Sequence, residues 1–172
     1  AELFLNLYLT EFCSWGFVQT DPNLGNFLLD LTARDLVLLD FGATREFSPE
    51  FRLQYSELVM ASVREDRKRC LELAQMLCLL DPRESNDAKE TLFELLKLSV
   101  SPFRKTYFDL NSDEYSKAMR SIGIKLIREL RFSPPPRDLI FLHRKLGGIF
   151  QILRRLEVTL DLRPFLNAFE GA

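Results

Sequence analysis

The sequence predicts a mainly helical α+β domain that contains one small β-hairpin. Apolar residues recur at helical spacing through most of the 172 residues. Only two short apolar runs, at residues 27–29 and 36–39, have the pattern of strands, and a polar turn over residues 30–35 joins them. The composition, 47% hydrophobic and 28% charged, is that of an ordinary globular domain. We therefore expect one domain over residues 1–172.

Start and stop signals delimit the helices. A first helix is expected over residues 1–16, and it ends at Gly16, a residue suited to a helix C-terminus. Residues 17–47 hold loops and the hairpin. Ser48 can cap the next helix while Pro49 takes its first position. Residues 48–172 then form a helical subdomain, with helices expected at 49–64, 66–80, 86–99, 112–130, 136–155 and 163–169.

The bulk properties exclude several classes of protein. Twenty-three basic and twenty-five acidic residues give a net charge of −2, so we expect no nucleic-acid partner. Cys13, Cys70 and Cys78 lack metal-site spacing and lie in apolar helical surroundings, which predicts buried, reduced thiols. No apolar run reaches the roughly 18 to 20 residues that span a bilayer, and no targeting signal is visible.

Polar residues flank the predicted hairpin at both ends. Asn26 lies directly before the first strand and Asp40 directly after the second, so the hairpin brings both to the same end. Phosphoryl transfer requires Mg²⁺ near the polyphosphate, and amide and carboxylate oxygens are suitable ligands for it. Asn26 and Asp40 are therefore predicted to bind the metal of a Mg-ATP site.

Asp21 lies five positions before Asn26, which is the spacing of a kinase catalytic-loop aspartate that orients the attacking hydroxyl or water. Phe41 and Gly42 complete an Asp-Phe-Gly motif and are expected to contribute to nucleotide binding. Each motif alone is weak, because Asp, Asn, Pro and Gly are common turn residues. Their order, helix, D-x4-N, hairpin, Asp-Phe-Gly, helices, is far more specific. It resembles the C-terminal lobe of a protein-kinase-like fold, in which the hairpin carries the catalytic and Asp-Phe-Gly loops.

Three longer segments narrow the resemblance. TDPNLGNFLL, LLDFGATREF and, further on, PPPRDLIFLHRKLGG resemble the UbiB (aarF-domain) family of atypical kinases, and specifically its mitochondrial coenzyme Q branch. The resemblance implies a magnesium-dependent, ATP-binding protein with ATPase activity that supports coenzyme Q (ubiquinone) biosynthesis at the matrix face of the inner mitochondrial membrane. It also implies a lipid or quinone-pathway metabolite, the inner-membrane surface and coenzyme Q biosynthetic proteins as partners.

Several positions depart from ordinary protein kinases. Thr20 stands where those enzymes carry the Arg of the His-Arg-Asp motif, and Asn23 stands where many carry a phosphate-binding lysine. No Ala-Pro-Glu motif follows Gly42, and only a short segment precedes the next helix. A protein acceptor is therefore disfavoured, and an ATPase or small-molecule kinase is favoured.

Two other functions stay open. One is a pseudokinase-like scaffold that organises biosynthetic enzymes. The other is a small-molecule phosphotransferase of the aminoglycoside or choline kinase type, although Gln19 stands where that class has a histidine. Apolar helical sequence follows Ala1 at once and no glycine-rich loop or Val-Ala-x-Lys strand is present, so we expect a piece of a longer protein without its N-lobe, inactive by itself.

The last long predicted helix carries further polar residues. His143, the only histidine, is expected to be structural. Gly147 and Gly148 would weaken a helix, which predicts that another backbone packs closely there. Four basic residues could form a face for a lipid or a partner, although a solvated face is the favoured interpretation: Arg144, Lys145, Arg154 and Arg155.

Overall fold

A computed structural model describes residues 1–30, 32–33, 35–109 and 111–170 and is mostly helical with small sheets. Helix α1 (Glu2–Leu9) continues as a π-helical segment, η1 (Thr10–Trp15). Gly16 follows in the left-handed region, at φ 74°. This conformation favours glycine, so the predicted end of the first helix is confirmed.

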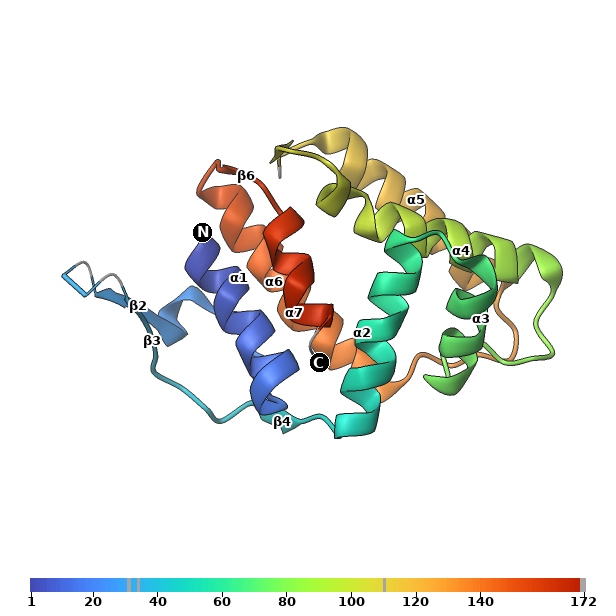
Figure 1. Cartoon of the computed structure of the whole chain (residues 1–172), viewed down its shortest axis with the longest axis horizontal. Coiled ribbons are helices and arrows are strands. Elements are labelled where there is room, and N and C mark those ends of the chain that lie inside the picture. Colours follow the sequence, from blue (N-terminus) through green and yellow to red (C-terminus); the bar gives the residue numbers. More distant parts are fainter. Residues whose placement is uncertain (31, 34, 110, 171–172) are drawn as a thin grey trace.

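The predicted hairpin forms from β2 (Phe27–Asp30) and β3 (Asp35–Leu38), which pair antiparallel with Phe27 opposite Leu38. Leu31 and Arg34 of the predicted turn lie outside the described residues. Figure 1 shows this hairpin projecting beyond the helices. Its position leaves the loops at its base, which carry the candidate site residues, at the edge of the helical body.

The expectation of a single pair of strands is wrong. β1 (Phe17–Gln19) also pairs with β4 (Thr44–Glu46), and β5 (Phe108–Asp109) pairs with β6 (Thr159–Leu160). These strands are two or three residues long, and their partners are distant in the sequence. Such pairings depend on tertiary contacts, so they leave almost no local alternation to detect.

The remaining helices agree closely with the expected ones. Ser48 Oγ accepts a hydrogen bond from Phe51 N (3.2 Å) and Pro49 takes the first helical position, as predicted. One helix ends at Met76 instead of residue 80, and Cys78 then adopts a positive φ of 56°. The helices are α2 (Pro49–Val63), α3 (Arg67–Met76), α4 (Asn86–Val100), α5 (Asp113–Glu129), α6 (Arg137–Arg155) and α7 (Asn167–Glu170), with short 3₁₀ turns at η2 (Leu24–Asn26), η3 (Ser101–Arg104) and η4 (Arg163–Leu166).

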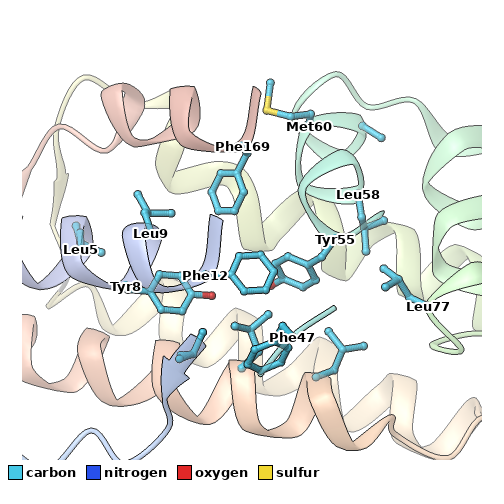
Figure 2. Packing of buried hydrophobic residues seen from close by; sticks show 14 of the residues in the cluster. Leu5, Tyr8, Leu9, Phe12, Phe47, Tyr55, Leu58, Met60, Leu77 and Phe169 are labelled. Carbon is cyan, nitrogen blue, oxygen red and sulfur yellow. The ribbon is translucent and has the colours of Figure 1, made fainter. Parts of the chain in front are cut away.

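The main hydrophobic core is formed largely by side chains from α1, η1, α2, α6 and α7. Its centre is Phe12, whose side chain is fully buried and whose ring centroid lies 5.3 Å from that of Tyr55 and 5.7 Å from that of Phe47. Figure 2 shows these rings close together between the helices, with Tyr8 and Phe169 beside them. Edge-to-face aromatic packing fixes ring orientation as well as burying apolar area. The core therefore holds η1, α2 and the residue that follows β4 together.

Figure 1 shows α1, α6 and α7 side by side, with α2 next to them and α3, α4 and α5 beyond. Among the described residues, no helix is both long and apolar enough to cross a membrane. The three cysteines are free thiols, as predicted. Their predicted burial holds for Cys70 but is wrong for Cys78, which is exposed in the turn after α3, and Cys13 is only partly buried.

Candidate functional site

The loop after β1 folds back so that Asp21 and Asn26 meet. Asn26 Nδ2 donates to Asp21 Oδ2 (3.2 Å) and to the backbone oxygen of Asp21 (3.3 Å). Between them, Asn23 Oδ1 accepts from Gly25 N (3.0 Å) and caps the 3₁₀ turn η2. The two polar residues of the D-x4-N motif therefore form one hydrogen-bonded unit.

The hairpin ladder extends one residue beyond β2 and β3 towards this loop. Leu39 N donates to the backbone oxygen of Asn26 (2.9 Å), so Asp40 directly follows the residue that pairs with Asn26. Asp40 Oδ1 accepts from Gly42 N (2.8 Å), and a Cβ on Gly42 would lie 3.1 Å from that oxygen. Phe41 is 63% exposed. Within the described residues, Asp40 makes no hydrogen bond to Asp21 or Asn26 but lies at the same end of the hairpin.

Thr20 links the loop after β1 to the segment after the Asp-Phe-Gly motif. Its backbone nitrogen and its hydroxyl both donate to the backbone oxygen of Ala43, at 3.1 and 2.8 Å. Thr20 is buried, so these bonds are shielded from water. The link forms without a phosphate group, which is consistent with the absence of the usual arginine at this position.

A buried polar cluster lies beneath the loop, and the sequence interpretation missed it. Lys145 Nζ lies 3.1 Å from Glu11 Oε2 and donates to Gln19 Oε1 at 3.3 Å. Glu11 Oε1 accepts from Gln19 N (3.1 Å), and all three side chains are at most 2% exposed. Burial raises the pKa of the Glu11 carboxyl and lowers the pKa of the Lys145 ammonium, while their mutual attraction opposes both shifts.

The spacing along α6 contained a signal for this cluster. Lys145 is three residues after Leu142 and four before Ile149, both of which are buried. That spacing places the lysine on the apolar face of the helix. The interpretation of Lys145 as part of a basic surface face is therefore wrong, because its charge pairs inside the protein.

Helix α6 contacts the loop after β1 directly at two points. Arg144 Nη2 lies 3.7 Å from Asp21 Oδ1. A Cβ on Gly148 would lie 2.1 Å from both Cβ and Cγ of Pro22, so only glycine fits at this contact. The predicted close packing is thus confirmed at Gly148, although a proline ring makes the contact. It is wrong at Gly147, where a Cβ would meet nothing within 4 Å.

His143 lies on the same helix and contacts α2. Its Nε2 is 3.1 Å from the hydroxyl oxygen of Tyr55, in α2. The hydrogen bond joins α6 to the aromatic core, which fits the predicted structural role.

The oxygens at the site suit a hard divalent cation. The amide nitrogen of Asn26 donates to Asp21, so the amide oxygen of Asn26 stays available as a ligand. Asp40 Oδ1 accepts from Gly42 N, and Asp40 Oδ2 stays available in the same way. Neither available oxygen accepts a hydrogen bond from the described part of the chain. That part also contains no group of three or more His, Cys, Asp or Glu side chains able to hold a metal. Mg²⁺ commonly takes only one or two protein oxygens and completes its shell with phosphates and water, so the pair fits this ion.

The mostly helical fold and the order of the motifs are consistent with a kinase-like protein, and residues 1–74 match the ABC1 atypical kinase-like domain. The predicted relationship to the UbiB (aarF-domain) atypical kinases is thereby confirmed. Over 164 residues the chain is 36% identical to the mitochondrial atypical kinase COQ8B of Rattus norvegicus. The aligned region covers 95% of this chain and 31% of that protein.

Two further relatives come from distant organisms. The mitochondrial atypical kinase COQ8 of Saccharomyces cerevisiae is 34% identical over 93% of this chain and 32% of its own length. A probable serine/threonine-protein kinase of Dictyostelium discoideum, abkA, is 28% identical over 97% of this chain and 31% of its own length. The chain thus spans about a third of the length of the curated relatives that it matches.

Proposed function

We propose that this chain is the C-terminal lobe of a Mg-ATP-dependent atypical kinase or ATPase. In this role, Asn26 and Asp40 hold the magnesium ion, and Asp21 orients the acceptor hydroxyl or water. The observation that carries the proposal is the contact of Asn26 Nδ2 with the Asp21 carboxylate (3.2 Å), at the same end of the hairpin as Asp40. It uses the amide nitrogen and leaves the amide oxygen for a cation.

The exposed surface around these loops is evidence in favour of an N-terminal lobe that packs against them. Several apolar side chains on and beside the hairpin are strongly exposed in this chain. Clustered exposed apolar side chains are unusual on the surface of a complete globular protein. An adenine ring and an N-terminal lobe would cover such side chains, and the chain alone would then lack turnover. The exposed residues are Leu28, Leu29, Val37, Leu39 and Phe41, each at least 44% exposed.

The relatives support the biological setting. Those of rat and yeast are named mitochondrial atypical kinases, which favours a mitochondrial location for this protein. Together with the motif resemblance, this favours a role in coenzyme Q biosynthesis at the matrix side of the inner membrane. The acceptor would be a lipid, a quinone-pathway metabolite or water, and coenzyme Q biosynthetic proteins would be partners.

Thermal unfolding with Mg-ATP tests the metal-nucleotide assignment in the full-length parent protein. A ligand that binds only the folded state stabilises it by about 2.7 kcal/mol when present at about 100 times its Kd. Asp40→Asn should abolish this stabilisation, because it removes a charged metal ligand. Asp87→Asn, an exposed change in α4, should keep it. Equal stabilisation of both variants would show that Asp40 does not hold the metal.

A further inference from the structure

The catalytic loop carries no positive charge of its own. Residues 20–26 contain neither Lys nor Arg. Asn23 stands at the position of the phosphate-binding lysine of many kinases, and its side-chain oxygen is used to cap the turn at Gly25 N (3.0 Å). Transfer of a phosphoryl group develops negative charge that protein cations normally balance. If the proposed function holds, a cation must reach the loop from another element.

Helix α6 places such a cation, the guanidinium of Arg144, beside Asp21. Arg144 Nη2 lies 3.7 Å from Asp21 Oδ1, and no other ion pair of Asp21 or Arg144 occurs among the described residues. The Arg144 side chain is 58% exposed and that of Asp21 39%, so a ligand can reach both from solvent. Arg45, also near α6, has its guanidinium carbon 3.5 Å from the ring centroid of Phe141.

Two residues that follow Arg144 fix the backbone of its helix against the loop. Lys145, the next residue, is fixed inside the protein by Glu11 (3.1 Å) and Gln19 (3.3 Å). One turn further, Gly148 packs directly against Pro22, the residue after Asp21. The backbone of α6 therefore cannot slide relative to the loop without breaking buried contacts. Such preorganisation is what electrostatic catalysis requires.

We propose that Arg144 is a catalytic residue that contacts the transferring phosphoryl group while it pairs with Asp21. In the step, the bond between the γ-phosphorus and its bridging oxygen breaks, and ADP leaves with that oxygen and the electron pair. A bond forms between the γ-phosphorus and the acceptor oxygen, whose proton passes to Asp21. Arg144 forms and breaks no covalent bond. Its planar guanidinium presents several N–H donors, so it can bind a carboxylate and a phosphate together.

Turnover and binding of a transition-state mimic in the full-length protein test this role. Arg144→Gln should lower turnover about 100-fold with little change in the KM for ATP, the loss typical of removing one charge-stabilising donor. Arg144→Lys should recover part of that loss. Arg155→Gln, an exposed change at the end of the same helix, is the matched control and should behave as wild type.

Thermal unfolding with Mg-ADP, with and without aluminium fluoride, gives a readout that does not depend on turnover. Wild type should bind Mg-ADP at least about 10-fold more tightly with aluminium fluoride, as expected of a transition-state mimic. Arg144→Gln should lose that gain but still bind Mg-ADP. A full aluminium fluoride response in Arg144→Gln would overturn the phosphate contact, whatever its turnover. No response of the wild type to any magnesium nucleotide would overturn the proposed function itself, and this inference with it.

Discussion

The contact between Gly148 and Pro22 predicts that two adjacent glycines respond in opposite ways to the same substitution. A methyl group on Gly148 would lie 2.1 Å from two carbons of the proline ring, whereas ordinary contact begins at 3.4 Å. The proline ring cannot rotate away, so α6 and the loop must separate by about 1.3 Å, the difference between these distances. At Gly147, a methyl group would meet nothing within 4 Å.

The magnitudes follow from these two environments. In Gly147→Ala, only the helix propensity changes, which should raise the free energy of unfolding by about 0.5 to 1 kcal/mol. In Gly148→Ala, overpacking should outweigh the same gain and lower the free energy of unfolding by about 1 to 3 kcal/mol. Since about 1 kcal/mol shifts the Tm of a domain of this size by roughly 2 to 4 °C, the two variants should be separated by several degrees.

Urea and thermal unfolding followed by circular dichroism measure this difference on the chain itself. Each variant is the control for the other, because the two residues are neighbours in one helix. Equal stabilisation of both would refute the close packing of Pro22 on α6. In the full-length protein, Gly148→Ala should also lower turnover by roughly 100-fold, since a displacement of about 1 Å at a reacting group has effects of that order.

Two further changes test the buried ion pair and the role proposed for Asp21. Lys145→Met should lower the free energy of unfolding by about 3 to 5 kcal/mol, because it leaves the Glu11 carboxylate buried without its partner. The double variant with Glu11→Gln should be destabilised by less than the sum of the single variants in urea unfolding, and additive losses would contradict the pairing. Asp21→Ala in the full-length protein should lower turnover by about 10²- to 10⁴-fold. It should also abolish quinone production in cells that depend on the protein, whereas quinone production sustained by this variant would favour the scaffold function.

Much of the fold was predictable because it depends on local chemistry. Ser48 and Pro49 mark the start of α2 through capping and fixed backbone geometry, and Gly16 marks the end of the first helix through its left-handed conformation. The β2–β3 hairpin was predictable because apolar runs flank a short polar turn. What the sequence did not reveal is non-local: β1 pairs with β4 across the whole site segment, and no local periodicity encodes that pairing.

The site was predictable only in part, for a similar reason. Asp21, Asn26 and Asp40 were identified by their spacing around one hairpin, and a short stretch of chain sets that geometry. Their roles stay predictions. Arg144 and Lys145 lie more than a hundred residues away, and adjacent charged residues on a helix usually indicate a solvated face. The partners of these two residues, on the loop and beneath it, exist only in the folded chain.

The departures from protein kinases acquire a common explanation once these contacts are considered. Thr20 stands where protein kinases carry an arginine that binds the phosphate of a phosphorylated activation segment. Here the backbone nitrogen and the hydroxyl of Thr20 both donate to the backbone oxygen of Ala43. Gln19, in place of a histidine, is anchored by Lys145 from α6. In each case a fixed contact within the fold occupies a position that protein kinases use for regulation or for the catalytic motif itself. A loop held in this way needs no activation segment to order it, which favours an enzyme that acts on a small acceptor and is not switched by phosphorylation.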